Sequence, residues 1–321
     1  MHTYGEIKNV IPGGIIANLR DRMLDVIDDL SAAYFPNLSH DDVMKRYAHS
    51  KPSRFSRAVA YRLFTQDTVD ALVPHLKRAA SGFWGDKNYS FYPVFYVRIS
   101  LPHSEGGHLL DSQPHYDRSF DCYAYSMWVP LEASNEETGG ICLFPDQELV
   151  DAFAHPFGNN RYDFDGYKEN YKDLDPVIRN KSITFDLDSG DVVTFDSDLL
   201  HGATRPISKP RLSFDVRLLS LEDQAADACA PELIKLFNEY VDCSNAMNLM
   251  TLGDPVGAKR ITEKLDRALL PTALRETLNA LENSGDMPPS KDLFEASPWH
   301  TEYSWFKIYK NYVESNSRGT A

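Results

Sequence analysis

The chain has 321 residues, of which 42% are hydrophobic and 12% aromatic, and its formal net charge is -14. This composition is sufficient for a globular core, and the acidic balance argues against nucleic acid or an anionic membrane as the main partner, because both attract basic surfaces. The acidic excess is typical of a soluble surface, but it also leaves open a cationic substrate.

Several absences indicate the compartment. No apolar run reaches the length of a membrane span, and residues 1–14 contain neither the basic nor the apolar part of a signal peptide. The four cysteines show no CxxC spacing and are too few for a disulfide framework; they are Cys122, Cys142, Cys229 and Cys243. We therefore expect a reduced, cytoplasmic protein.

Residues 1–90 are predicted to form a helical region that packs on the rest of the chain. Apolar residues recur at helical spacing from Gly14 to Phe35. Ser39, followed by His-Asp-Asp, predicts the start of a second helix, and a third is expected over residues 68–81. These segments carry no recognisable chemistry, which indicates that they serve as packing elements.

From about Phe91 the hydrophobic period changes to two, which indicates β-strands. Strands are expected at 91–101, 123–131, 140–144, 182–187, 191–196 and 211–220. Turn residues such as Thr-Gly-Gly at 138–140 and Ser-Gly-Asp at 189–191 separate several of them. Many short strands between turns favour a sandwich or barrel, so we predict a mainly β core at 91–220 with flanking helices.

Two further regions complete the predicted organisation. Residues 151–180 form an insert whose first part, 151–175, has no clear period; such a segment is either a lid over a site or an ordinary surface loop. Residues 221–321 show helical apolar stripes, which indicate core contacts or a homodimer formed through these helices. We expect the helical region, the core and this extension to form one integrated domain.

The sequence also predicts a metal site. Two imidazoles and one carboxylate on one face of an iron(II) octahedron leave positions open for an oxo-acid and dioxygen. A strand bearing His-x-Asp supplies two of these ligands, because residues i and i+2 point the same way. The His-x-acid pattern occurs four times, beginning at His40, His103, His115 and His300. Only His115 and Asp117 lie among the predicted strands, so we predict that this pair binds the metal.

His201 is the candidate for the second imidazole. It follows the turn and alternating segment 189–200, and with Gly202 it is expected to close that strand. The ordinary alternative is a hydrogen-bonded histidine with no metal. Residues 211–218 then alternate without a break, with one polar face made of Arg211, Ser213, Asp215 and Arg217. That face either meets water or lines a barrel interior.

A guanidinium beside a serine hydroxyl suits the distal carboxylate of 2-oxoglutarate, through paired charge-assisted hydrogen bonds. Arg211 with Ser213 is therefore the preferred co-substrate site, and Arg217 and Arg205 are the alternatives. The keto oxygen and carboxylate at the other end of the diacid would bind the iron. These residues predict a site that takes iron(II), 2-oxoglutarate and dioxygen.

Six short segments occur in an order known from one enzyme family. They are 113–117, 125–131, 137–145, 189–195, 201–202 and 210–213. Over residues 91–220 the chain thus resembles the phytanoyl-CoA hydroxylase-like iron(II)/2-oxoglutarate dioxygenases. The resemblance implies a double-stranded β-helix (jelly-roll, cupin-like) core. It also implies that His115, Asp117 and His201 bind the iron and that Arg211 binds the co-substrate.

The resemblance further implies an oxidoreductase that hydroxylates an unactivated C–H bond while converting 2-oxoglutarate to succinate; desaturation or ring formation is the second choice. Asp117 favours oxygen chemistry, because related halogenases carry a small residue there. Tyr96 and Arg98 share one face of a predicted strand, and they either line the co-substrate and substrate pocket or pack in the barrel. The expected substrate is a polar small molecule, such as an amino acid, a sugar or a natural-product intermediate. A cupin-like metalloprotein of another class and a non-catalytic binding protein are the competing interpretations.

Overall fold

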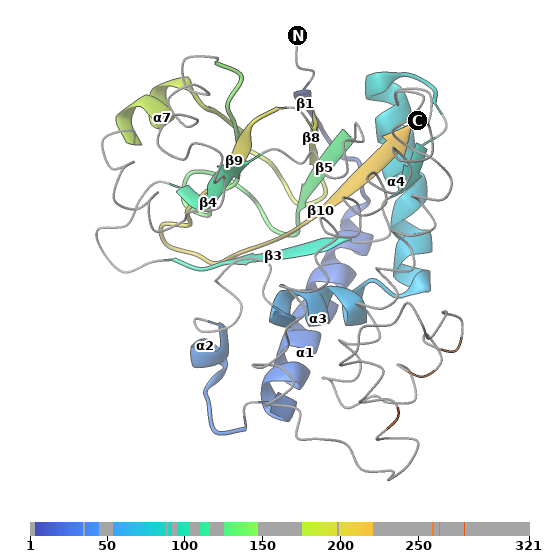
Figure 1. Cartoon of the computed structure of the whole chain (residues 1–321), viewed down its shortest axis with the longest axis vertical. Helices are drawn as coiled ribbons and strands as arrows, with labels where there is room; N and C mark the ends of the chain where they lie inside the picture. Colours follow the sequence, from blue (N-terminus) through green and yellow to red (C-terminus); the bar gives the residue numbers. More distant parts are fainter. Residues whose placement is uncertain are drawn as a thin grey trace, which may run out of the picture. The chain divides into compact units, whose positions relative to one another are not determined.

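The computed structural model describes residues 4–34, 36–44, 54–87, 89–91, 95–102, 110–115, 125–146, 175–197 and 199–220, with three single residues beyond them. Every element that positions the predicted site belongs to one compact unit, made of residues 1–28, 38–119 and 123–223. Two antiparallel sheets form the centre of this unit (Figure 1).

The larger sheet contains β1 (Tyr4–Ile7), β2 (Tyr89–Phe91), β3 (Tyr96–Ser100), β5 (Tyr125–Pro130), β8 (Val192–Asp196) and β10 (Arg211–Ser220). Its order is β1-β8-β5-β10-β2, and β3 also pairs with β10. The smaller sheet contains β4 (Leu110–His115), β6 (Ile141–Leu143), β7 (Ile183–Thr184) and β9 (His201–Thr204), in the order β4-β9-β6-β7.

The strand order defines the fold. Among the described strands from β3 to β10, the chain passes back and forth between the two sheets, except that β6 and β7 follow each other within one sheet. The result is β3-β10-β5-β8 facing β4-β9-β6-β7, which is the double-stranded β-helix, or jelly-roll. The predicted fold class is therefore confirmed. β1 was not predicted; it adds to the edge of the larger sheet, where Tyr4 lies opposite Phe195.

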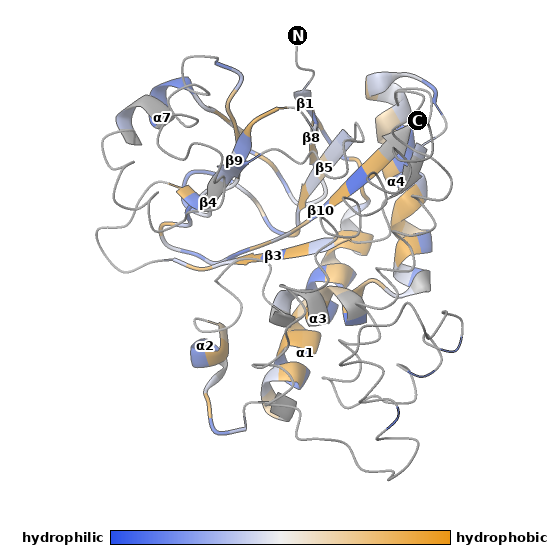
Figure 2. Cartoon of the chain, in the orientation of Figure 1, coloured by the Kyte–Doolittle hydropathy of each residue, from blue (hydrophilic) through white to orange (hydrophobic). Residues whose placement is uncertain are grey.

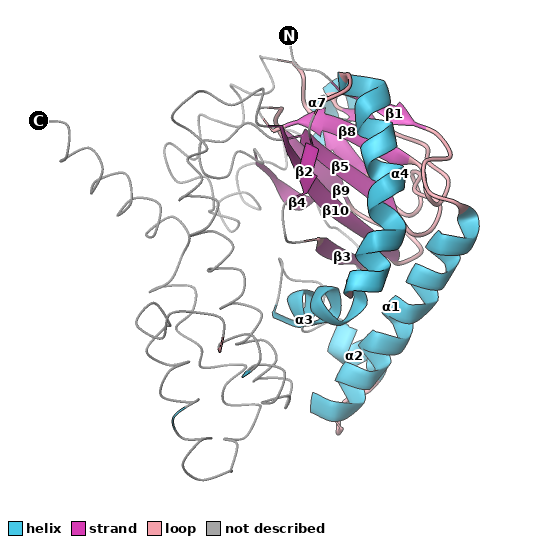
Figure 3. Ribbon diagram, turned by 90° about the vertical axis from the view of Figure 1, so that its right-hand side faces the viewer, coloured by secondary structure: helices cyan, strands magenta, loops and turns pink. Residues whose placement is uncertain are grey.

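Helix α4 (Gln66–Trp84) lies over the outer face of the larger sheet, with α1 (Gly13–Tyr34) and α3 (Arg54–Leu63) next to it (Figure 3). The other helices are α2 (His40–Val43) and α7 (Asp175–Lys181), which precedes β7. Helix α1 forms as predicted, because Ile16, Leu19 and Met23 recur on one buried side of it. The Ser39 hydroxyl accepts the backbone N–H of Asp42 at 3.1 Å and so caps α2. Helix α3 was not predicted.

The alternation of β10 separates the outer face from the inner one, and it is visible as hydrophobic and hydrophilic bands in Figure 2. On the outer face, Phe214 packs edge-on against Phe64 with ring centres 5.4 Å apart and stacks with Phe95 at 6.3 Å. On the inner face, Asp215 lies opposite Tyr96 and Trp128 in the sheet register. The second of the two predicted alternatives, a polar face turned into the barrel, is therefore confirmed.

The inner face of the larger sheet is divided into two halves. Toward β5 and β8 it is apolar: Trp128, Val193 and Phe195 form a buried cluster with Ile141 and Leu143 of the smaller sheet. Toward β3 and β10 it is polar, because Arg98 lies opposite Ser213 and Ser100 lies opposite Arg211. The polar side chains of β10 are thus buried between two sheets.

The prediction that His201 closes the strand begun at 191 was wrong: β8 ends at Asp196, Leu199 N–H donates to the Asp196 carbonyl at 3.1 Å in a turn, and His201 begins β9. The lid at 151–174 and the helical extension at 221–321, with the homodimer proposed through it, lie outside the described residues. Within the parts that are described, no helix is long and apolar enough to cross a membrane.

Candidate functional site

The two predicted histidine ligands lie side by side on neighbouring strands of the smaller sheet. His115 ends β4 and His201 begins β9, and the two residues are direct partners in the antiparallel register. Their ring centres lie 4.4 Å apart, with the ring planes inclined by 52°. His201 is only 3% exposed, and its ring packs against Phe195 with 4.5 Å between centres. The fold therefore brings together two imidazoles that lie 86 positions apart in the chain.

The hydrogen bonding of His201 selects the nitrogen that can bind a metal. Its Nδ1 lies 3.0 Å from the Leu199 carbonyl oxygen, which can only accept. Nδ1 therefore carries the proton and donates, and Nε2 keeps the lone pair that a metal needs. Metal-binding histidines commonly use a backbone carbonyl in this way to fix the tautomer and the ring orientation.

The spacing of the two rings fits a shared ion. Two imidazoles on adjacent positions of one octahedral ion have ring centres about 4.5 Å apart, if the metal–nitrogen bonds are about 2 Å long. The separation of 4.4 Å between His115 and His201 is close to this value. Imidazole donors also suit iron(II).

The third predicted ligand, Asp117, lies outside the described residues, two positions beyond the end of β4. Among the residues that are described, no group of three or more His, Cys, Asp or Glu side chains is arranged to hold a metal ion. The complete triad of His115, Asp117 and His201 thus stays a prediction. Of the competing His-x-acid pairs, His40 begins helix α2, as expected, and the other two lie outside the described residues.

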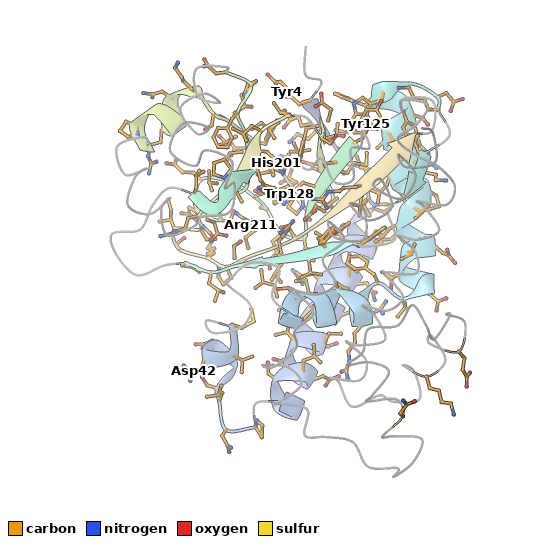
Figure 4. The ribbon with its side chains drawn as sticks, viewed as in Figure 1. Tyr4, Asp42, Tyr125, Trp128, His201 and Arg211 are labelled. Atoms are coloured by element: carbon orange, nitrogen blue, oxygen red, sulfur yellow. The ribbon has the colours of Figure 1, made fainter. Side chains whose placement is uncertain are left out.

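Arg211 connects the two sheets from inside. It begins β10 and is 2% exposed. Its Nη1 donates to the Thr204 carbonyl at 2.8 Å, and its Nη2 donates to Ser100 Oγ at 2.7 Å. Asp111 of β4 forms an ion pair with Nη2 at 3.6 Å. Figure 4 shows Arg211, Trp128 and His201 between the strands of the two sheets, and the guanidinium lies 5.9 Å from the centre of the Trp128 ring.

Two buried polar atoms beside this guanidinium lack a hydrogen-bond partner among the described residues. They are Nε of Arg211 and Oγ of Ser213, on the same face of β10. Ser213 is fully buried, so its hydroxyl has no access to bulk water. Burial lowers the pKa of Arg211 from its ordinary value, Asp111 opposes this change, and Arg98 adds to it. A buried donor that is left unsatisfied costs free energy, so an acceptor that reaches both atoms would be bound favourably.

The Thr204 carbonyl that accepts from Arg211 packs closely against a glycine, Gly139. Gly139 has a φ of +65°, a conformation that favours glycine. A Cβ at this position would collide with the Thr204 carbonyl oxygen and the Arg205 backbone. The turn at 138–140 therefore packs directly on the strand end that anchors Arg211.

The remaining predicted residues gather on the same inner face. Arg98 Nε donates to Asp215 Oδ1 at 2.7 Å, and Arg217 Nη1 donates to Asp215 Oδ2 at 3.0 Å. The guanidinium of Arg217 lies 4.7 Å from the centre of the Tyr96 ring. Tyr96 and Arg98 are thus placed on the inner face with Arg211. They contact Arg217 and Asp215, and Arg98 also lies opposite Ser213 in the register of β3 and β10.

Sequence reasoning missed three partners of this site. Asp111 lies 100 positions before Arg211, and Ser100 lies 111 positions before it, so neither contact leaves a local signal. The anchoring carbonyl of Thr204 belongs to the backbone and has no sequence signature. The register of β3 on β10, which places Ser100 opposite Arg211, was the one feature that an alternating pattern could have suggested.

No protein-family model and no curated protein matches this sequence. Among solved structures, the chain is similar to the epimerase SnoN in complex with Fe3+, alpha ketoglutarate and nogalamycin RO, with 16% identity, coverage of 71% of this chain and 89% of that one, and a TM-score of 0.44. The non-heme alpha ketoglutarate dependent carbocyclase SnoK from nogalamycin biosynthesis shows 14% identity, coverage of 68% and 80%, and a TM-score of 0.44. EctD from S. alaskensis with 2-oxoglutarate and 5-hydroxyectoine shows 16% identity, coverage of 69% and 73%, and a TM-score of 0.39. The resemblance to the phytanoyl-CoA hydroxylase-like family remains a prediction.

Proposed function

We propose that the chain is an iron(II)- and 2-oxoglutarate-dependent oxygenase that hydroxylates, or otherwise oxidises, a C–H bond of a polar small molecule. The observation that carries this proposal is the pair of buried, unpartnered atoms at Arg211 Nε and Ser213 Oγ. They lie inside a double-stranded β-helix that also holds two imidazoles at the spacing of a shared ion.

Each residue of the candidate site has a defined role in this proposal. His115 and His201, with the predicted ligand Asp117, would hold the iron, and the Leu199 carbonyl keeps His201 Nε2 available as a ligand. A bound iron(II) would supply the dioxygen chemistry, with 2-oxoglutarate giving succinate and carbon dioxide. The apolar cluster that includes Trp128 and Phe195 borders the His201 imidazole through Phe195 and would exclude water from that side.

Arg211 and Ser213 would orient the co-substrate. Thr204 is three residues beyond His201 on β9, so the carbonyl that anchors Arg211 lies about 10 Å along the strand from His201. A five-carbon diacid can bridge the space between them when its keto-acid end is at the metal and its distal carboxylate is at the arginine. Because the guanidinium is already fixed by Thr204 and Ser100, little side-chain freedom is lost on binding.

The competing interpretation is a cupin-like metalloprotein that does not use 2-oxoglutarate. It would need both imidazoles, but it gives no role to the unpartnered Arg211 Nε and Ser213 Oγ. A non-catalytic binding protein, in turn, gives no role to the fixed tautomer of His201. Both alternatives therefore leave a described feature of the inner face without a purpose.

The test is the decarboxylation of 2-oxoglutarate by the iron-loaded protein in air without substrate, measured as succinate. We expect slow succinate formation that is abolished in His201→Ala and strongly reduced in Arg211→Leu. Arg179→Leu, an exposed arginine on α7, serves as the matched control and should behave as the wild type. Iron binding without succinate formation would favour the cupin-like interpretation, and equal rates in Arg211→Leu and wild type would remove Arg211 from the site.

A further inference from the structure

A second group of charged side chains lies on the inner face of the larger sheet. We refer to Tyr96, Arg98, Asp215 and Arg217 as the basic cluster. Asp215 accepts hydrogen bonds from Arg98 Nε at 2.7 Å, Arg98 Nη2 at 3.4 Å and Arg217 Nη1 at 3.0 Å. The guanidinium carbons of Arg98 and Arg217 lie 5.6 and 4.7 Å from the centre of the Tyr96 ring. The two guanidiniums are thereby held by one carboxylate and one aromatic ring, and the four side chains together carry one net positive charge.

The sheet register places one member of this cluster, Arg217, in a cross-strand row that leads toward His201. Arg217 lies opposite Ser126 on β5, and Ser126 lies opposite Phe195 on β8. Phe195 in turn packs against the His201 ring. Arg211 is six residues earlier on β10, which corresponds to about 20 Å along an extended strand. Arg217 is therefore distant from Arg211 along β10, whereas Arg98 lies directly opposite Ser213. The basic cluster thus adjoins the Arg211–Ser213 pair at Arg98 and extends to the cross-strand row that leads to His201 at Arg217.

The burial of the cluster changes along its length. Arg217 and Asp215 are 7% and 6% exposed, whereas the Arg98 side chain is 31% exposed. The cluster thus extends from the interior of the barrel to solvent. Buried ion pairs are a poor source of stability, because hydrophobic residues of similar volume stabilise a core equally well or better. The arrangement therefore points to a binding role for the arginines.

We propose that the basic cluster binds the primary substrate and that the group it recognises is a carboxylate. This inference rests on the proposed function and adds the substrate class to it. A guanidinium presents its N–H groups as a planar fork that matches a carboxylate, and prior fixation by Asp215 and Tyr96 reduces the entropy lost on binding. The net charge of -14 for the whole chain then reflects the surface, while the inner face selects an anion.

The test uses size-matched pairs of acid and amide as probes: phenylacetate with phenylacetamide, N-acetylglycine with its amide, and hexanoate with hexanamide. Each compound is titrated calorimetrically, without oxygen, into the iron-loaded protein saturated with 2-oxoglutarate. We expect at least one acid to bind about 10- to 100-fold more tightly than its amide, as a charge-assisted hydrogen bond predicts.

Variants of the basic cluster show whether its arginines cause this preference for the acid. Arg98→Gln leaves the Asp215–Arg217 ion pair intact, so it tests the cluster without exposing a buried charge. Both Arg98→Gln and Arg217→Gln should abolish the preference for the acid, while Arg179→Gln should keep it. The inference is overturned if no acid binds at millimolar concentration, if the amides bind equally well, or if the preference survives in both cluster variants. Titrations into the metal-free protein separate this inference from the proposed function, because the preference is measured there even when 2-oxoglutarate does not bind.

Discussion

Replacing Ser213 with alanine should have opposite effects on the free and the liganded protein. The hydroxyl is fully buried and has no hydrogen-bond partner among the described residues. A buried, unsatisfied hydroxyl costs about 1–3 kcal/mol, and the small cavity left by alanine cancels part of that gain. We therefore expect Ser213→Ala to raise the free energy of unfolding without ligand by about 0.5–1.5 kcal/mol.

With 2-oxoglutarate bound, the same hydroxyl would donate to a carboxylate. Hydrogen bonds to charged groups contribute about 1.5–3 kcal/mol, so Ser213→Ala should weaken 2-oxoglutarate binding by about 10- to 150-fold. A ligand stabilises the folded state according to its affinity. The variant should thus be more stable than the wild type without 2-oxoglutarate and less stable with it.

Urea denaturation with and without 2-oxoglutarate, on the iron-loaded protein without oxygen, measures both effects. Thr194→Val is the matched control: the Thr194 hydroxyl is also fully buried but donates to the Ser126 carbonyl at 3.2 Å. That control should lose about 0.5–1.5 kcal/mol under both conditions and leave the affinity unchanged. The reasoning is refuted if Ser213→Ala lowers the stability of the free protein by more than about 1 kcal/mol, or if it binds 2-oxoglutarate as the wild type does.

Three further predictions concern the frame around the site. Gly139→Ala should lower the free energy of unfolding by about 1–3 kcal/mol and weaken 2-oxoglutarate binding, because the new Cβ would displace the Thr204 carbonyl that anchors Arg211. An unchanged stability in denaturation and an unchanged affinity in calorimetry would contradict this. Phe214→Ala should lower the free energy of unfolding in urea by about 3–5 kcal/mol and leave the affinity for 2-oxoglutarate unchanged, because Phe214 packs on the outer face of the sheet. A changed affinity would show that the outer face is not separate from the site. Burial raises the pKa of Cys142 from 9.0 to about 12, so peptide mass spectrometry should show that its thiol resists alkylation at pH 8. The free energy of unfolding should fall as pH rises from 9.0 toward about 12, because the thiol ionises in the unfolded chain but stays protonated in the folded one. Rapid alkylation of native Cys142 would show that the thiol is accessible.

The sequence was most informative where a pattern is both periodic and buried. The strand at 211–220 was predicted with the bounds that β10 has. Its apolar side packs on helices and its polar side lines the barrel interior, so apolar and polar residues alternate strictly from 211 to 218. By contrast, β1 is four residues long and is defined only by pairing with β8, almost 190 positions away. No local pattern can indicate such a partner.

The error at His201 has a similar cause. Leu199 and Leu200 are apolar and buried although they follow residues of types typical of turns, Asp196-Ser197-Asp198, so they indicate a continuation of the strand toward His201. The hydrogen bond from Leu199 N–H to the Asp196 carbonyl shows that the chain turns there and that His201 begins a new strand. The contacts that fix Arg211 were equally inaccessible, since Ser100 meets it only when β3 pairs with β10, and Asp111 only when the two sheets face each other.

The central claim is that the imidazole pair binds iron(II) and that Arg211 binds 2-oxoglutarate beside it. The most direct measurement is an anaerobic titration of iron(II), and then of 2-oxoglutarate, into the metal-free protein, followed by the visible metal-to-ligand charge-transfer band. We predict a band that is absent in His115→Ala and that needs far more 2-oxoglutarate in Arg211→Leu. Bound iron without any band, or a band that is unaffected by both substitutions, would contradict the claim.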